Sequence, residues 1–189
     1  MERNTTRPRV LVVHESMFGN TRQVAEAITR GLRDNMDVDM IAASDPSALA
    51  MAADRDLVVI GAPTHEYGLS HPGSRHEAVR WSQDKGQRFK LETAAATTGV
   101  RELLPGLAER VSVFAAFDTR IDMPRMFTGS AAKIIDRLLR DEGCTLFTEP
   151  QSFLVDHRSR LLPRELDRAE EWGRTLGARL DASPDSATP

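Results

Sequence analysis

A short segment that combines hydroxyl, amide and glycine residues is the part of this sequence best suited to bind an anion. It begins at Ser16, contains Gly19 and Asn20, and ends at Thr21, directly before a helical pattern. Hydroxyl and amide donors beside the exposed N–H groups of a helix start form a cradle for an anion, and a glycine allows close approach. The segment therefore predicts an anion site after the first strand.

The same segment excludes several classes of phosphate-binding protein. It has no lysine in a Gly-x-x-x-x-Gly-Lys-Ser/Thr arrangement and no Gly-x-Gly-x-x-Gly, which disfavours a triphosphate with magnesium and a dinucleotide pyrophosphate. A phosphorylated receiver needs acidic residues where the chain has His14-Glu15 and Gly61-Ala62, and a cysteine phosphatase needs a thiolate in this loop, far from Cys144. A single monophosphate group fits the segment best.

Short apolar runs alternate with amphipathic stretches, which is typical of βαβ units that feed a parallel sheet. Strands are predicted over residues 9–14, 37–42, 56–61, 111–117 and 145–155, the last broken at Pro150. The third run is continuously apolar, which indicates that helices cover both faces of its sheet. The pattern predicts an α/β fold with a doubly wound parallel sheet of five strands.

Apolar residues at helical spacing predict the helices between these strands. A stripe through Val24, Ile28 and Leu32 follows the anion segment, and the cleanest helical pattern covers residues 129–142. Further helices are predicted over residues 46–51, 98–109 and 163–180. Ligands of open parallel sheets bind beyond the carboxyl ends of the strands, so the loops after the first, third and fourth strands are expected to form the site.

Composition narrows the functional classes further. The chain has 189 residues with 40% hydrophobic residues, and its 25 basic and 28 acidic side chains give a net charge of −3, which indicates neither a nucleic acid nor an anionic membrane as a partner. The apolar runs are too short to span a bilayer, and no apolar signal region precedes residue 9. One cysteine excludes an internal disulfide framework, and a cytoplasmic location is expected.

Three segments in the expected order resemble the flavin loops of flavodoxins and of the flavodoxin modules in flavodiiron proteins. The resemblance covers residues 9–155. Its motifs are Ser16-Met17-Phe18-Gly19-Asn20-Thr21, Gly61-Ala62-Pro63-Thr64-His65-Glu66-Tyr67-Gly68 and Phe117-Asp118-Thr119-Arg120. The resemblance implies a flavodoxin-like sheet in the order 2-1-3-4-5 and one FMN bound noncovalently.

The resemblance also assigns a part of the cofactor to each segment. The first segment would hold the FMN phosphate through hydroxyls and backbone N–H groups. The second would line the flavin ring, with His65 or Tyr67 against it, and the third would border the pyrimidine end. The implied cofactor-binding residues are Ser16, Met17, Phe18, Gly19, Asn20, Thr21, Pro63, Thr64, His65, Tyr67, Gly68, Phe117, Asp118, Thr119 and Arg120. No catalytic acid, base or nucleophile and no metal site is expected.

The chain also departs from the flavodoxin pattern. It is nearly neutral, and its third loop offers no tyrosine or tryptophan to cover the ring. A long passage between the third and fourth strands predicts an insertion over residues 70–97, which contains basic residues such as Arg75 and Arg80. Such a loop could receive a dinucleotide phosphate or an acidic redox partner, or it could be a solvated insertion.

The sequence leaves three functions open on one predicted domain over residues 9–182, with a flexible terminus over 1–8 and a disordered tail over 183–189. The first is electron transfer through FMN to a redox partner protein or a small-molecule acceptor. The second is an NAD(P)H-dependent FMN oxidoreductase similar to quinone reductases or flavodoxin-type protoporphyrinogen oxidases. The third is a flavin-free interaction module.

Overall fold

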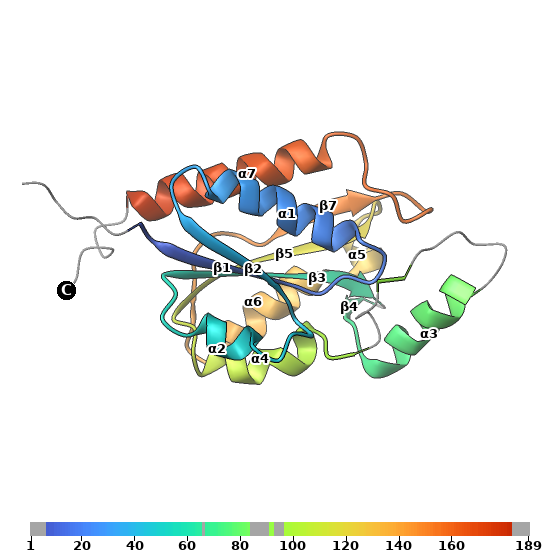
Figure 1. Cartoon of the computed structure of the whole chain (residues 1–189). Coiled ribbons are helices and arrows are strands. Elements are labelled where there is room, and N and C mark those ends of the chain that lie inside the picture. Colours follow the sequence, from blue (N-terminus) through green and yellow to red (C-terminus); the bar gives the residue numbers. More distant parts are fainter. Residues whose placement is uncertain (1–6, 66, 84–90, 93–96, 183–189) are drawn as a thin grey trace, which may run out of the picture.

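The computed structural model of the chain describes residues 7–65, 67–83, 91–92 and 97–182 (Figure 1). The predicted tail at 183–189 lies outside these residues, as does most of the predicted terminus at 1–8. Residues 84–90 and 93–96 of the predicted insertion also lie outside them. Within the part of the chain that is described, no helix is long and apolar enough to cross a membrane.

A parallel sheet forms the middle layer of the molecule, and β1 (Arg9–His14) is one of its inner strands. The path runs β2-β1-β3-β5-β6, with β7 also paired to β5. Its other strands are β2 (Asp37–Ala42), β3 (Leu57–His65), β5 (Val113–Ile121), β6 (Thr145–Leu146) and β7 (Gln151–Val155). The last two flank Pro150 and pair with successive parts of β5, so together they are the predicted fifth strand. The predicted 2-1-3-4-5 order is confirmed.

The third and fourth predicted strands run four residues further than the apolar pattern indicates. Pro63, Thr64 and His65 belong to β3, and residues 118–121 belong to β5. The two strands pair as far as Pro63, and an added strand, β4 (Gly68–Leu69), pairs antiparallel with Thr64 and His65. The extensions contain polar side chains, so the apolar pattern does not indicate them. Backbone pairing with neighbouring strands holds them in the sheet.

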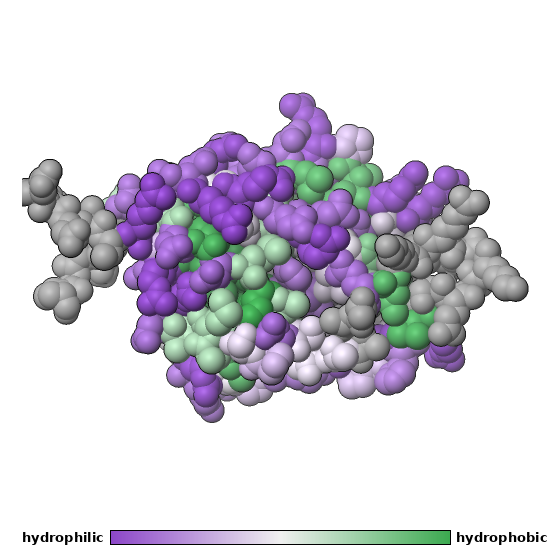
Figure 2. All heavy atoms as spheres, viewed as in Figure 1, coloured by the Kyte–Doolittle hydropathy of each residue, from purple (hydrophilic) through white to green (hydrophobic). Residues whose placement is uncertain are grey.

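Helices cover both faces of the sheet (Figure 1). One face carries α1 (Asn20–Leu32) and α7 (Glu165–Asp181), and the other carries α2 (Ala48–Ala52), α4 (Val100–Ala108) and α6 (Ala131–Asp141). Figure 2 shows hydrophilic residues over α1 and α7 along the upper edge, and apolar residues gathered over α2 below. The five helices expected from apolar spacing are therefore present.

Alternate residues of the central strands fill two separate cores. In β1, Leu11 and Val13 pack in the cluster under α2, α4 and α6, whereas Val10 and Val12 pack in the cluster under α1 and α7. All four side chains are fully buried. Because both faces are covered, these strands need apolar residues at every position, as the sequence predicted.

Two glycines let α1 and α7 cross at close range. A Cβ on Gly31 would overlap the carbonyl oxygen of Glu170, and a Cβ on Gly173 would overlap that of Ile28. The helix backbones therefore touch directly, without side chains between them. This contact fixes the position of α1, whose first two residues, Asn20 and Thr21, are the last two of the predicted anion segment.

Two helices lie outside the predicted set, α3 (Pro72–Gln83) and α5 (Arg125–Thr128). The helix α3 belongs to the predicted insertion and lies beyond β4, at the end of the sheet where the strands finish (Figure 1). Its sequence contains few apolar residues and therefore gives no clear helical period. The insertion is thus partly helical and adjoins the predicted site.

Candidate functional site

A cavity of about 350 Å³ opens where β1, β3, β5 and β7 end. This volume lies within the range of small-molecule sites. Four segments line it, and their residues are Met17, Phe18, Asn20, Thr21, Pro63, Thr64, His65, Thr119, Arg120, Ile121, Val155, Asp156, His157 and Ser159. The structure therefore brings residues of all three predicted segments to one cavity and adds a fourth segment.

The first segment turns into α1 through a left-handed residue. Gly19 has a φ of 88° and precedes the helix, and its N–H donates to Ser16 Oγ at 3.1 Å. The helix has 13 residues, with neither a side-chain cap at its start nor an acidic residue in its first turn. The partial positive charge of this helix start is therefore directed to the cavity edge without a carboxylate from the helix itself.

Two threonine hydroxyls link the first and third segments. Thr21 Oγ1 and Thr119 Oγ1 lie 2.8 Å apart, and both residues are buried and line the cavity. One hydrogen bond between two hydroxyls uses only one of their two hydrogens. The second hydrogen is available to donate to an oxygen in the cavity.

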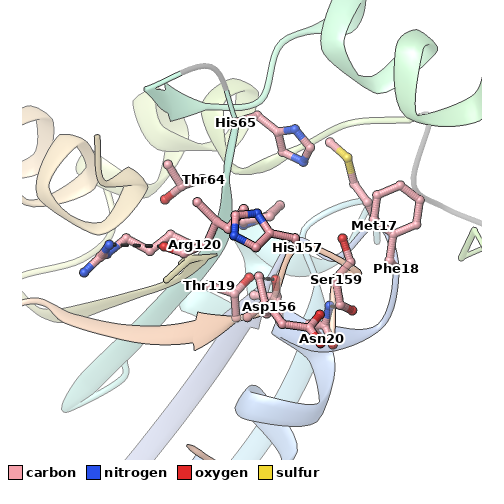
Figure 3. A pocket seen from close by; sticks show the side chains of 14 residues that line it. Met17, Phe18, Asn20, Thr64, His65, Thr119, Arg120, Asp156, His157 and Ser159 are labelled. Carbon is pink, nitrogen blue, oxygen red and sulfur yellow. Dashed lines mark hydrogen bonds between the residues drawn. The ribbon is translucent and has the colours of Figure 1, made fainter. Parts of the chain in front are cut away.

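The fourth segment, residues 155–159, was missed by the sequence analysis. Asn20 Nδ2 donates to the backbone oxygen of Ser159 at 2.7 Å, which fastens this segment to the start of α1. Figure 3 shows His157 and Ser159 around the cavity together with Met17, Phe18 and Asn20. The signal that could have found them is their position directly after the last strand, at the same edge of the sheet as the other segments.

In the second segment, strand pairing separates residues that reach the cavity from residues that do not. Pro63, Thr64 and His65 line it. Tyr67 is 67% exposed, has a φ of 72°, forms an isolated bridge with Gly129 and is not among the lining residues. Gly68 is buried, and a Cβ there would approach Ile134 to 2.6 Å. His65 therefore lines the cavity, and Tyr67 lies outside it.

Asp118 does not line the cavity but binds the start of the helix beside it. Its Oδ2 accepts from Ser130 Oγ at 2.5 Å and from the N–H of Ala132 at 3.0 Å, so the carboxylate caps α6. Thr64 Oγ1 accepts from the N–H of Ala131 at 3.0 Å. Asp118 and Thr64 therefore tie the second and third segments to one helix start.

Phe117 belongs to the core. Its ring is fully buried and meets the rings of Phe153 and Trp172 edge-on, with centroids 6.2 and 6.3 Å apart. A Cβ on Gly61 would overlap the Phe117 ring. The predicted role of Phe117 at the flavin is replaced by a packing role, because its position in β5 directs the side chain to the face covered by α1 and α7.

Arg120 lines the cavity with its stem, while its guanidinium turns away from Met17 and Phe18 (Figure 3). Nη1 donates to the carbonyl oxygen of Met123 at 2.6 Å and contacts Thr128 Oγ1 at 3.4 Å. Burial lowers the pKa of Arg120, an effect that nearby Asp118 opposes. The residue therefore shapes the third segment and adds positive charge beside the cavity.

The predicted insertion packs against the first segment. Leu91 and Phe18 both pack against Met17, and the N–H of Glu92 donates to the Met17 carbonyl oxygen at 2.8 Å. The Glu92 carboxylate lies 2.6 Å from Arg22 Nε, and this hydrogen bond raises the pKa of Arg22. The end of the insertion thus braces the first segment from outside the cavity.

A network that contains the buried Glu15 and Arg75 and the more exposed Glu102 joins the residue before this segment to the start of the insertion. Glu15 Oε2 accepts from the N–H of Val100 at 2.8 Å, and Glu15 Oε1 accepts from the Ser70 hydroxyl. Arg75 Nη1 donates to Ser70 Oγ at 2.9 Å, and Arg75 Nη2 lies 2.8 Å from Glu102 Oε1. Only 4% of Arg75 is exposed, so this predicted basic residue of the insertion cannot meet a ligand or partner.

Comparison with known proteins agrees with the observed fold. No protein-family model and no curated protein matches the sequence. A flavodoxin from the domain Archaea superposes with a TM-score of 0.61 at 18% identity, covering 92% of this chain and 99% of that one. The reduced flavodoxin of Megasphaera elsdenii gives a TM-score of 0.57 at 16% identity, with 89% and 98% covered.

A longer protein contains the same unit. The metal-soaked flavodiiron core from Synechocystis superposes with a TM-score of 0.64 at 18% identity, over 93% of this chain but 36% of that one. The chain therefore forms a flavodoxin-like domain. At these identities the likeness concerns the fold, and it confirms the fold that the three sequence motifs implied.

Proposed function

We propose that the chain binds one FMN noncovalently in this cavity and acts in electron transfer. The observation that carries the proposal is the pairing of two surfaces in one cavity. One is the uncapped start of α1 with the hydroxyls of Thr21 and Thr119, and the other is an apolar surface that includes Met17 and Ile121. An anion cradle beside an apolar surface suits a ligand with one phosphate and one flat ring.

The donor set fits a monophosphate. The helix start and the spare threonine hydrogen supply neutral donors, and Asn20 holds the neighbouring segment in place through Ser159. Ser16 Oγ accepts from the Gly19 N–H and so holds the turn before α1, although Ser16 itself does not line the cavity. No lysine or arginine of the first segment is required, in agreement with the absence of a nucleoside-triphosphate motif.

Bound FMN would supply one-electron and two-electron chemistry, and the chain would supply position and charge. His65 and His157 approach the cavity from the second and fourth segments, and Arg120 lies beside the third. Positive charge near a flavin favours its anionic reduced form, which the buried Asp118 carboxylate opposes. Among the neighbours, the Megasphaera protein is described as two-electron reduced flavodoxin, which supports a carrier role.

An NAD(P)H-dependent oxidoreductase is the second candidate, because a further hollow adjoins the cavity. It has a volume of about 600 Å³ and shares Phe18, Asn20 and Ser159 with the first. Its remaining lining includes Arg160, whose guanidinium is held by Asp156, and Arg164, which is suited to a phosphate-bearing second substrate. If the chain is such an oxidoreductase, its second substrate binds in this hollow and not at the basic insertion.

The visible spectrum of the purified chain tests the proposal first. We expect a yellow protein that releases FMN on denaturation, and a colourless protein that ignores added FMN would leave the flavin-free module as the function. Adding NADPH or NADH alone under anaerobic conditions then separates carrier from enzyme. Fast bleaching without a separate reductase indicates the enzyme, and no direct reaction indicates the carrier.

The first segment is tested by replacing Ser16, Asn20 and Thr21 together with alanine. Each loses a polar group that holds the loop or faces the phosphate, so we expect FMN affinity to fall at least about 100-fold. Riboflavin has no phosphate, so its affinity should be the same for the unmodified chain and for the triple variant. The matched control replaces the exposed Ser112, Asn35 and Thr175, which do not line the cavity. Unchanged FMN affinity in the first variant would show that the phosphate binds elsewhere.

A further inference from the structure

Four large apolar or aromatic side chains are exposed on two short segments beside the cavity. They are Tyr67, Met123, Met126 and Phe127, with exposed fractions of 67%, 41%, 79% and 59%, and we call them the rim patch. Among the described residues, one other large hydrophobic side chain, Leu138, is similarly exposed. Clustered exposure of this kind is uncommon on a monomeric surface and marks a contact site.

The rim patch is joined to the cavity through chain continuity, one backbone bridge and one side-chain hydrogen bond. Tyr67 follows the lining residue His65 by two positions and pairs with Gly129 in an isolated bridge. The lining residue Arg120 donates to the Met123 carbonyl oxygen at 2.6 Å. The two segments that carry the patch therefore continue the second and third segments of the cavity outward.

The charge around the rim patch differs from that of the remaining chain. Residues 120–140 carry five basic and two acidic side chains, although the chain as a whole has a net charge of −3. Arg125, between Met123 and Met126, is exposed, as are Lys133 and Arg137 on the following helix α6. Basic side chains therefore flank the apolar residues along this stretch of the chain, which we call the basic surround, on a protein whose remaining net charge is negative.

We propose that the rim patch and its basic surround form the docking surface for an acidic electron-transfer protein. This inference rests on the proposed function and adds the chemistry of the partner. A few apolar side chains bury too little area for a stable dimer but suit the small interfaces of transient redox pairs. Opposite charge steers such a partner to the mouth of the cavity and sets its rate of association.

A plant-type [2Fe–2S] ferredoxin serves as the acidic probe and cytochrome c as the basic one. In the first reaction, one electron passes from the reduced cluster to oxidised FMN in the loaded chain. In the second, one electron passes from the reduced flavin to ferric haem. Stopped-flow rates are measured between about 20 and 300 mM NaCl. We expect the ferredoxin rate to fall at least about tenfold with salt and the cytochrome rate not to fall.

Three variants locate the surface. Arg125→Glu with Arg137→Glu should lower the low-salt ferredoxin rate about tenfold and remove its salt dependence. Met126→Ser with Phe127→Ser should lower the rate at every salt concentration while keeping the salt slope. The control, Arg7→Glu with Arg33→Glu, makes the same change in net charge at exposed positions before β1 and after α1, the opposite end of the sheet. It should keep the rate of the unmodified chain within about twofold.

Several results would overturn the docking surface. They are a ferredoxin rate independent of salt, patch variants that match the control, patch variants that dissociate a dimer in ultracentrifugation, and binding of phosphatidylserine vesicles that these variants abolish. A chain that binds no FMN refutes the proposed function separately. In that case, titration of the isotope-labelled chain with oxidised ferredoxin decides the docking surface: shifts confined to residues 120–140 and Tyr67 support it, and their absence overturns it.

Discussion

At the scale of single residues, the left-handed backbone of Gly19 determines the path of the chain into α1. Its φ of 88° lets its N–H reach Ser16 Oγ just before the helix begins. A residue with a Cβ is strained in this region, whatever space surrounds it. The side-chain space itself is adequate, because a Cβ at this position would lie 3.5 Å from the nearest atom, Glu92 Oε1.

We therefore predict that Gly19→Ala lowers the free energy of unfolding by about 1–2 kcal/mol and weakens FMN binding. Gly143→Ala is the matched control, since Gly143 has a φ of 91°, lies outside the cavity and has no atom within 4 Å of an added Cβ. It should lose similar stability but keep its FMN affinity. Urea denaturation and fluorescence titration measure the two quantities, and equal FMN affinity in both variants would contradict the prediction.

At the scale of elements, a charge network built on the buried Glu15 and Arg75, with the Glu102 side chain 35% exposed, holds α3 and α4 against the first segment. Arg75 lies between Ser70 and Glu102, and Ser70 in turn contacts Glu15. Glu15 and Arg75 are 6% and 4% exposed. Removing one partner from a buried ionic network leaves charge without compensation, which costs more than a pair is worth at the surface.

We predict that Arg75→Met lowers the free energy of unfolding by about 3–5 kcal/mol. Arg174→Met is the control: Arg174 contacts Asp34, Glu170 and Glu171 at the surface, and its loss should cost at most about 1 kcal/mol. Chemical denaturation of both variants provides the comparison. Similar losses in the two would show that burial adds nothing to the Arg75 contacts.

The contact between α1 and α7 is a second test at this scale. Gly31→Ala should destabilise the chain by more than 1 kcal/mol, about the cost of overpacking, because its Cβ would overlap the Glu170 carbonyl oxygen. Gly177→Ala, on the same pair of helices, meets its nearest atom at 3.7 Å and should stabilise by about 0.5–1 kcal/mol. Thermal unfolding should therefore shift in opposite directions, and equal shifts would refute the close crossing.

At the scale of the whole molecule, carboxylates with lowered pKa values make the free energy of unfolding depend on pH. Burial acts to raise the pKa of Glu102, but hydrogen bonds from Arg75 and the Gly99 N–H hold it below its ordinary value. Hydrogen bonds from Arg160 also hold the pKa of Asp156 below its ordinary value. Each pKa lies lower in the folded chain, so the unfolded chain binds more protons as the pH falls.

We predict that the free energy of unfolding decreases as the pH falls from about 5 to about 3, because this stabilisation is present above the unfolded pKa values and is lost through the folded ones. Glu102→Gln should make the decrease shallower. Urea denaturation across this pH range measures both curves. An unchanged slope in the variant would show that Glu102 does not contribute.

Local patterns determined much of this protein from the sequence alone. Continuous apolar runs predicted the strands, because residues buried on both faces must be apolar at every position. The glycine, hydroxyl and amide residues from Ser16 to Thr21 predicted a turn into a helix start that is able to bind an anion, because capping and turn geometry depend on neighbours in the sequence. The resemblance of three such segments then fixed the strand order.

Tertiary structure decided which side chains reach the cavity. Asn20 meets Ser159, Thr21 meets Thr119 and Glu15 meets Val100, at separations of 139, 98 and 85 residues. No helical or strand period extends over such distances, so local patterns could neither pair these residues nor bury Arg75. Packing of the helices on the two faces of the sheet sets these distances, and it alone turned Phe117 into the core while leaving His65 at the cavity.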